Sequence, residues 1–311
     1  MDKWNGSLVA EFVLLGLSQD RQVQIYLFLV FLVIYMTTLF GNVILITACV
    51  TEPRLHTPMY FFLVNLSFLD ICYSTVIVPN VLVHFLASRK SMSFSACAAQ
   101  MYAFMLLGCT EGILLAAMSF DRYVAISSPL RYNVIMSKSV CVALAVFCWL
   151  SGTVMGTLDT VFTLVLPFCS QNVIDHFFCE STALLKLACA DTHITETVMF
   201  YVAIYVLLIP TSIIILSYLR ILVAILGIRT AAGRYKAFST CGSHLIVVTM
   251  FYGTAIFMYM KPASQKSDYL DKMVSVFYTV SPPLLNPMIY SLRNKDVKMA
   301  MQKVAARRLI L

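Results

Sequence analysis

Met118-Ser119-Phe120-Asp121-Arg122-Tyr123-Val124-Ala125-Ile126 is the stretch that decides how this chain folds. It closes an apolar run over 94–120, and a run of about 20 residues is enough for a helix to cross a bilayer. An acid and a base then stand side by side where the run should meet water. Two interpretations are possible. The pair could be a charged boundary that fixes the end of the helix at the membrane surface. It could instead be a switch, in which the arginine leaves the aspartate and binds another partner.

The composition sets the class of protein. Of the 311 residues, 60% are hydrophobic and 12% are charged, and the mean hydropathy is +0.85. These values exclude a soluble domain and predict a polytopic membrane protein, with no nucleic-acid partner. Residues 1–21 lack the apolar core of a cleavable signal peptide, so the first membrane segment is expected to serve as the insertion signal.

Seven apolar segments are long enough to span a bilayer. They cover 24–50, 58–87, 94–120, 140–158, 197–226, 241–260 and 273–292. We therefore predict an all-α membrane protein with one domain over 1–311, a seven-helix bundle over 24–292. An outer N-terminus covers 1–23. The tail, 293–311, alternates bases with apolar residues and is expected to form a short amphipathic eighth helix on the inner leaflet.

The charges in the loops orient these segments. If the N-terminus and the even-numbered connections form one side, that side carries eight Lys and Arg residues and the other side carries fourteen. The cytoplasmic side holds the excess of bases, so the N-terminus is expected outside and the tail inside. A glycosylation sequon at Asn5 lies on the predicted exterior. We expect a multi-pass protein of the plasma membrane.

Most of the apolar segments contain a distinct short motif, and these motifs follow one another in order along the chain. They are Gly41-Asn42, Pro58-Met59-Tyr60-Phe61-Phe62-Leu63, Asp121-Arg122-Tyr123, Ser217-Tyr218, Lys236-Ala237-Phe238-Ser239-Thr240-Cys241 and Pro282-Pro283-Leu284-Leu285-Asn286-Pro287-Met288-Ile289-Tyr290. In order and spacing, they resemble the motifs of olfactory (odorant) receptors, a branch of the rhodopsin-like G-protein-coupled receptors. The resemblance covers the chain from about Glu11 to Lys298, and the long second outer loop resembles the class II, or tetrapod, branch.

The resemblance implies a receptor that binds a small neutral odorant and raises cAMP through a stimulatory, olfactory-type heterotrimeric G protein. It implies no cofactor beyond a bound ion, no enzymatic activity, and a location in the cilia of olfactory sensory neurons. One alternative is a rhodopsin-like receptor for a non-odorant small molecule outside the nose. A membrane transporter is the other, and it is disfavoured because the sequence shows neither related halves nor paired broken helices.

The resemblance also implies a signalling switch in the inner half of the bundle. Its members are Asp121, Arg122, Tyr123, Tyr218, Lys236, His244, Asn286, Pro287 and Tyr290. No acid lies between residues 220 and 260, so the sixth segment offers Arg122 no counter-ion. We therefore expect Asp121 to hold Arg122 at rest, and hydrogen bonds of Tyr252 and His244 to hold the sixth helix.

Four cysteines lie on the predicted exterior, where disulfides persist. Sequence alone leaves three connectivities for four cysteines. The resemblance implies that Cys97 pairs with Cys179 and that Cys169 pairs with Cys189.

Two acids, Asp70 and Glu111, lie within apolar segments. A carboxylate inside a membrane is expensive and is a functional candidate by default. The pair could hold Na⁺, because this hard cation takes oxygen ligands, or each acid could be protonated and hydrogen-bonded without an ion.

The resemblance places the ligand between the outer halves of the third, fifth, sixth and seventh helices. Helical spacing selects one inward face of each helix. The selected residues are Phe104, Met105, Gly108, Cys109, Val202, Val206, Tyr252, Ala255, Ile256, Tyr259, Val276 and Thr279. Taken singly, each is better explained as a packing residue, but as a set they describe an apolar cavity with a few hydroxyls and one thiol. None is charged, so we expect a neutral, mostly apolar, volatile ligand, to which Tyr259 and Thr279 offer hydrogen bonds.

Overall fold

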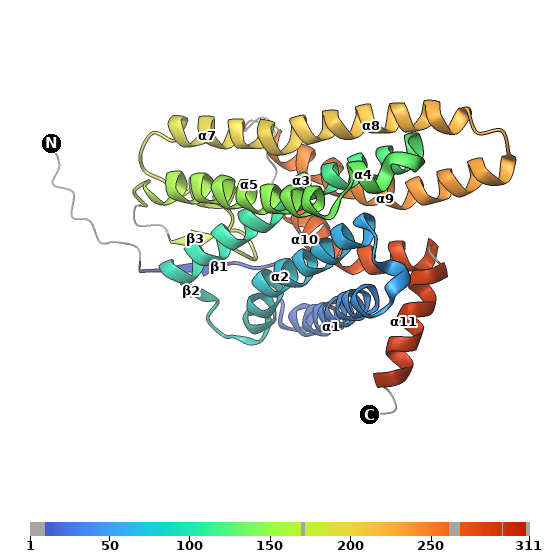
Figure 1. The fold of residues 1–311 in the computed structure, drawn as a ribbon. Coiled ribbons are helices and arrows are strands. Elements are labelled where there is room, and N and C mark those ends of the chain that lie inside the picture. Colours follow the sequence, from blue (N-terminus) through green and yellow to red (C-terminus); the bar gives the residue numbers. More distant parts are fainter. Residues whose placement is uncertain (1–9, 169–171, 261–267, 294, 309–311) are drawn as a thin grey trace.

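The computed structural model describes residues 10–168, 172–260, 268–293 and 295–308, and the chain within these ranges is mainly helical (Figure 1). The long helices are α1 (Arg21–Thr51), α2 (Pro58–Leu86), α3 (Phe94–Ser127), α5 (Lys138–Leu164), α7 (His193–Ala203), α8 (Ile209–Leu226), α9 (Ala231–Tyr259), α10 (Asp268–Arg293) and α11 (Lys295–Arg308). A π-helical turn, Ile204–Leu208, joins α7 to α8, so these two form one continuous rod. Short helices α4 (Tyr132–Ile135) and α6 (Ser181–Leu185) lie in connections.

Six of the described helical runs are long and apolar enough to cross a membrane. They are α1, α2, α3, α5, the α7–α8 rod, and the part of α9 over Cys241–Tyr259. Helix α10 occupies the place of the predicted seventh segment, but its first turns carry Asp271 and Lys272 and three prolines interrupt it later. The structure confirms a mainly helical fold with six apolar helices of spanning length, and the seventh crossing and the orientation stay predictions.

Several helices run beyond the predicted apolar segments. Helix α3 ends at Ser127 rather than at 120, so Asp121 and Arg122 lie inside the helix and not at its end. Helix α9 begins at Ala231 rather than at 241, where the Thr230 side chain accepts a hydrogen bond from the backbone of Gly233. Hydropathy ends a segment at the first charges, whereas helical hydrogen bonding continues until a cap or a break stops it.

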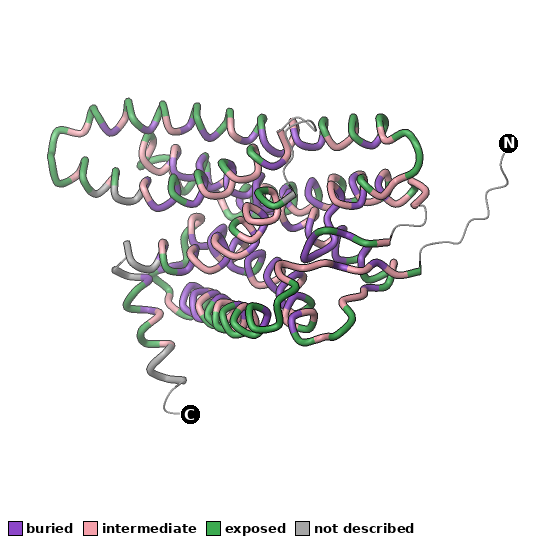
Figure 2. The backbone as a smooth tube through the Cα atoms, turned by 180° about the vertical axis from the view of Figure 1, so that it is seen from behind, coloured by how far each residue is buried: buried purple, intermediate pink, exposed green. Residues whose placement is uncertain are grey.

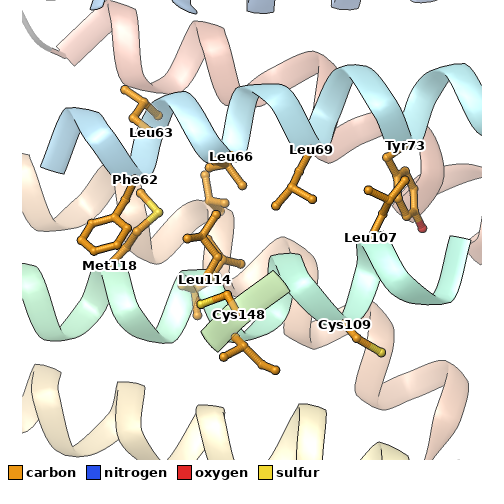
Figure 3. Close-up of a cluster of buried hydrophobic side chains, with 14 of the residues drawn as sticks. Phe62, Leu63, Leu66, Leu69, Tyr73, Leu107, Cys109, Leu114, Met118 and Cys148 are labelled. Atoms are coloured by element: carbon orange, nitrogen blue, oxygen red, sulfur yellow. The ribbon is translucent and has the colours of Figure 1, made fainter. Parts of the chain in front are cut away.

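The core lies where α2, α3 and α5 meet. Figure 3 shows Leu66 of α2 close to Leu114 of α3, with Cys148 of α5 beside them, and all three are almost fully buried. Figure 2 shows the opposite pattern on α1 and α8, whose outward faces are exposed. The exposed residues there are large and apolar, as in Val33 and Val223, which suits a surface that faces lipid rather than water.

Helices α3 and α5 approach each other closely because α5 presents glycine at Gly152 and Gly156. A Cβ atom on Gly156 would lie 2.9 Å from the backbone nitrogen of Leu106, closer than packed atoms allow. Small residues spaced four apart let membrane helices pack backbone to backbone.

A small sheet that the sequence did not predict covers the end of the bundle that the predicted orientation places outside, which we call the outer end. Strand β1 (Glu11–Leu14) lies between β2 (Ser91–Ser93), to which it is antiparallel, and β3 (Val173–Ile174), to which it is parallel. The disulfide between Cys97 and Cys179, expected from the resemblance, is present and ties α3 to the loop after α5. Asn5 and Cys169 lie outside the described residues, so glycosylation and the Cys169–Cys189 pair stay predictions.

Candidate functional site

A cavity of about 640 Å³ lies near the outer end of the bundle, where it is lined by residues of α2, α3, α5, α6, α7, the π-helical turn, α9 and α10. Its wall is mostly apolar and aromatic, as is usual for sites that bind small molecules. The residues that line it include Tyr73, Phe104, Met105, Gly108, Cys109, Met199, Phe200, Val202, Val206, Phe251, Ala255, Met258, Tyr259 and Tyr278.

Eight of the twelve predicted ligand residues lie on this wall: Phe104, Met105, Gly108, Cys109, Val202, Val206, Ala255 and Tyr259. The other four, Tyr252, Ile256, Val276 and Thr279, do not line it. The Tyr252 hydroxyl instead donates to the backbone oxygen of Gly112 at 2.6 Å, and the Thr279 hydroxyl donates to that of Ser275 at 2.7 Å. Helix α9 is therefore rotated so that Phe251, Ala255 and Met258 face the cavity.

The wall also carries charged residues that the sequence-based selection of ligand residues did not include. Glu111 and Asp159 line the cavity, and the exposed Lys186 and Glu196 lie along it as well. The sequence-based selection missed Asp159 because the predicted fourth segment stopped at 158, one residue short of the acid. A signal was available, since Gly152, Gly156, Asp159 and Thr163 recur at helical spacing and all four are buried.

Glu180 carries the polar contacts that close the outer end of the cavity. It is almost fully buried, and the Tyr259 hydroxyl donates to its Oε1 at 3.1 Å. The Nε2 atom of His176 lies 3.6 Å from Oε2. The expected hydrogen bond from Tyr259 to a ligand therefore competes with a bond inside the protein.

His176 packs inside the loop and not at its surface. Its ring stacks on Phe177 with centroids 4.7 Å apart, and it is buried. Burial, followed by the nearby Lys272 charge, lowers the pKa of His176 to about 3. Its contact with Glu180 is therefore made by a neutral imidazole.

At the inner end, Asp121 is bonded differently from the prediction. Its Oδ1 accepts a hydrogen bond from the hydroxyl of Tyr132 in α4, at 2.7 Å. Within the described part of the chain, Asp121 forms no ion pair with Arg122. The expectation that Asp121 directly holds Arg122 is therefore not met, because α4 folds back under α3 and supplies a neutral donor first.

Arg122 is buried and lies within electrostatic reach of Tyr218, His244 and Tyr290. The Tyr218 hydroxyl lies 2.8 Å from Nδ1 of His244, and this bond joins α8 to α9. The predicted switch residues of α3, α8, α9 and α10 thus surround one buried guanidinium.

The remaining predicted switch residues are placed as follows. Tyr123 packs against the inner cluster of Ile221, Ile225 and Cys241. Pro287 packs against Gly41 of α1. Lys236 belongs to α9, and its side chain lies outside the described part of the chain.

The mid-membrane acids have different surroundings. Asn286 donates to both carboxylate oxygens of Asp70, at 3.1 and 3.0 Å. Glu111 interacts electrostatically with Asp70, and its buried Oε1 has no hydrogen-bond partner among the described residues. The same is true of the Ser67 hydroxyl, so this part of the bundle holds oxygen atoms that suit a hard cation.

Comparison with known proteins extends this description. The sequence pattern of the family described as "Olfactory receptor" matches residues 31–308. Human "Olfactory receptor 2D2" is 52% identical over 307 residues, which are 99% of this chain and 99% of that receptor. Mouse "Olfactory receptor 5AR1" is 50% identical over 308 residues, and human "Putative olfactory receptor 2B3" is 50% identical over 303 residues. These cover 99% and 97% of both chains, respectively.

Proposed function

Because this chain belongs to the olfactory receptor family, whose members are G-protein-coupled receptors and not enzymes, we propose that it detects a small, mostly apolar, neutral volatile molecule. The observation that carries the proposal is the cavity of about 640 Å³. Aromatic and aliphatic side chains from α3, α7, the π-helical turn and α9 make up most of its wall, and such a wall favours a molecule with little polar surface. The ligand binds there and stabilises a second arrangement of the helices.

The signal leaves through the inner end of the bundle to a stimulatory, olfactory-type heterotrimeric G protein, which raises cAMP. Arg122 is the residue that changes partners. Movement of α9 away from α3 and α8 would break the Tyr218–His244 bond and open the inner end around Arg122. The buried bond from Tyr252 to Gly112 opposes this movement, because it ties α9 to α3 directly beneath the cavity.

The proposal includes seven crossings, with the N-terminus outside and the tail inside, in the plasma membrane of the sensory cilium. The excess of bases on the α11 side supports this orientation. The disulfide supports it as well, because the loop that bears Cys179 then lies in an oxidising compartment.

We further propose a Na⁺ site between Asp70 and Glu111. The carboxylate oxygens, together with the unpartnered Ser67 hydroxyl, form a set of hard oxygen donors in the middle of the membrane. A bound cation would offset the repulsion between the two acids and hold α2, α3 and α10 together.

A cell-based screen tests the proposed function. The full chain is expressed in cells that carry an olfactory-type stimulatory G protein, and cAMP is measured against a panel of neutral volatile compounds. At least one compound should raise cAMP in a saturable manner, and cells without the chain should not respond. A chain that reaches the surface and responds to no compound, while moving a solute across the membrane, would contradict the proposal in favour of a transporter.

A further inference from the structure

We propose that Asp159 anchors the polar end of the ligand, and that the ligand is therefore a hydrogen-bond donor, an alcohol or a phenol, rather than a ketone, ester or ether. This inference rests on the proposed function, because it names the class of molecule that the same cavity takes. It departs from the sequence-based expectation, in which Tyr259 and Thr279 offer the hydrogen bonds to the ligand.

The first observation that supports the proposal is the position of Asp159. The residue lies on the inward face of α5, lines the cavity, and is only 1% exposed. Ser181, at the start of α6, donates to Oδ1 at 3.3 Å. The other oxygen, Oδ2, is buried and has no hydrogen-bond partner among the described residues. One carboxylate oxygen is thus fixed by the protein while the other remains available as an acceptor beside the cavity.

The engagement of the two expected donors supports it next. The two hydroxyls that were expected to serve the ligand are engaged, Tyr259 with Glu180 and Thr279 with its own helix. No ion pair joins Asp159 to a basic side chain in the described ranges, and Lys186 and Glu196 lie at exposed positions. Inside the wall, the charged groups are the acids Glu111 and Asp159. A ligand group that donates is therefore matched, and a ligand with only a carbonyl or ether oxygen leaves Oδ2 without a donor.

The physical argument concerns an unmet acceptor. A buried polar atom without a hydrogen bond is costly, and the cost disappears when a ligand supplies the donor. An ether of the same shape fills the same apolar volume but leaves Oδ2 unmet. Sites built around a buried polar group discriminate strongly against analogues that lack the matching group.

The test compares matched ligands on the full-length receptor. Each alcohol in the panel is paired with its methyl ether and with the primary amine of the same skeleton, and surface-normalised cAMP gives the potency. We expect alcohols to act at concentrations lower by about tenfold or more than their ethers. The Asp159→Leu variant should remove this gap by weakening the alcohols alone. Asp159→Asn, which keeps an acceptor oxygen, should retain part of it.

Asp191→Asn is the matched control, because Asp191 is an exposed acid of the outer loop between α6 and α7, and its side chain accepts one hydrogen bond among the described residues, from the backbone of His193. It should leave the alcohol-to-ether ratio unchanged. Thermal unfolding of the purified receptor with the same alcohol and ether pairs gives a binding measurement that does not need the G protein. Ethers that equal their alcohols in both cAMP potency and thermal stabilisation would contradict the anchoring role of Asp159.

The experiments can reject the proposed function and the anchoring role of Asp159 independently of each other. Alcohol-selective stabilisation without any cAMP response would reject the proposed signalling and keep the anchor. Amines that outrank alcohols, with the preference lost in Asp159→Asn, would keep Asp159 as the anchor and reject a neutral ligand.

Discussion

Arg122 is the residue whose surroundings differ most from the sequence-based expectation. The aspartate beside it is bonded to Tyr132 and attracts the guanidinium, and Tyr218, His244 and Tyr290 of α8, α9 and α10 lie within its electrostatic reach as well. A buried base without a paired acid has a high free energy unless several dipoles surround it. Arg122 can therefore donate hydrogen bonds to an acceptor group of a protein that docks at the inner end.

The first prediction is that Arg122→Ala abolishes the agonist-dependent rise in cAMP while the ligand still binds. The cavity lies near the opposite end of α3, so the loss should appear in signalling and not in ligand-induced thermal stabilisation. Arg54→Ala, an exposed base of the first inner loop, is the control and should signal as the unaltered receptor does. Normal signalling by Arg122→Ala would remove Arg122 from the switch.

The second prediction concerns Asp121 and its partner. Asp121→Asn removes the negative charge next to Arg122 but keeps an oxygen that can accept from Tyr132. Tyr132→Phe removes the hydrogen bond and keeps the charge. We expect basal cAMP per receptor at the surface to rise more in Asp121→Asn than in Tyr132→Phe. The reverse order would show that the position of α4, rather than the charge, controls the resting state.

The third prediction uses His176. Its pKa in the folded loop is about 3, below the value of about 6.5 in an unfolded chain. Between these values the unfolded chain binds a proton that the folded chain excludes. The stabilising contribution is therefore complete above about pH 6.5 and is lost as the pH falls, by about 1.4 kcal/mol per unit.

Thermal unfolding of purified receptor at about pH 7.5 and about pH 5.5 measures this effect. The His176→Gln variant, which does not titrate in this range, should show a smaller decrease at the lower pH. An equal decrease in both proteins would mean that His176 is already protonated in the folded loop.

At the scale of elements, the contact between α3 and α5 fixes the side of the cavity that carries Asp159. Gly156 lies against the backbone of Leu106, and Phe104 and Met105, on the same stretch of α3, line the cavity. The helices therefore cannot slide apart without changing the shape of the binding site.

The fourth prediction is that Gly156→Leu destabilises the receptor by about 1–3 kcal/mol, the usual range for forcing a side chain into a filled interface. Gly253→Leu is the control, because a Cβ there meets no atom within 4 Å. The measurement is thermal unfolding in detergent, together with surface expression. Equal unfolding temperatures for the two variants would contradict the close approach of α3 and α5.

The sequence predicts the elements well where apolar residues alone determine them. The bounds predicted for α2, 58–87, match Pro58–Leu86 because a proline starts this helix and the apolar run sets its length. The extension of α3 to Ser127 could not be predicted, because the helix continues through charges that fold inward. Strand β1 was missed as well, since its partners β2 and β3 lie far away in the sequence.

For the candidate site, the helical period identifies the inward face of α3 correctly, whereas on α9 it places Ala255 and Tyr259 correctly but not Tyr252 and Ile256. The Tyr252 hydroxyl determines the rotation of α9 by bonding to Gly112, and no local pattern reveals that bond. Asp159 is a second residue of the site that the sequence-based prediction did not identify. An acid near the end of an apolar segment looks like a boundary, and only the packing of α5 on α3 shows that it faces inward.

At the scale of the whole molecule, a cavity lies at one end of the bundle and a buried arginine, Arg122, lies at the other. Helices α3 and α9 are the physical link, because each contributes to the cavity and to the surroundings of Arg122. The bonds from Tyr252 to Gly112 and from Tyr218 to His244 lie between the two sites and join α9 to its neighbours. A ligand that shifts α9 must therefore alter the inner end as well.

The central claim is that a ligand inside this cavity drives signalling, and filling the cavity tests it most directly. Gly108 lines the cavity, and the nearest atom to a Cβ at this position belongs to Tyr73, 3.8 Å away, so Gly108→Leu can fold while occupying the space of the ligand. The measurement is surface-normalised cAMP against agonist concentration, with Gly253→Leu as the control. The account predicts that Gly108→Leu needs about tenfold more agonist or fails to respond, while the control behaves as the unaltered receptor. An unchanged response of Gly108→Leu at equal surface expression would contradict it.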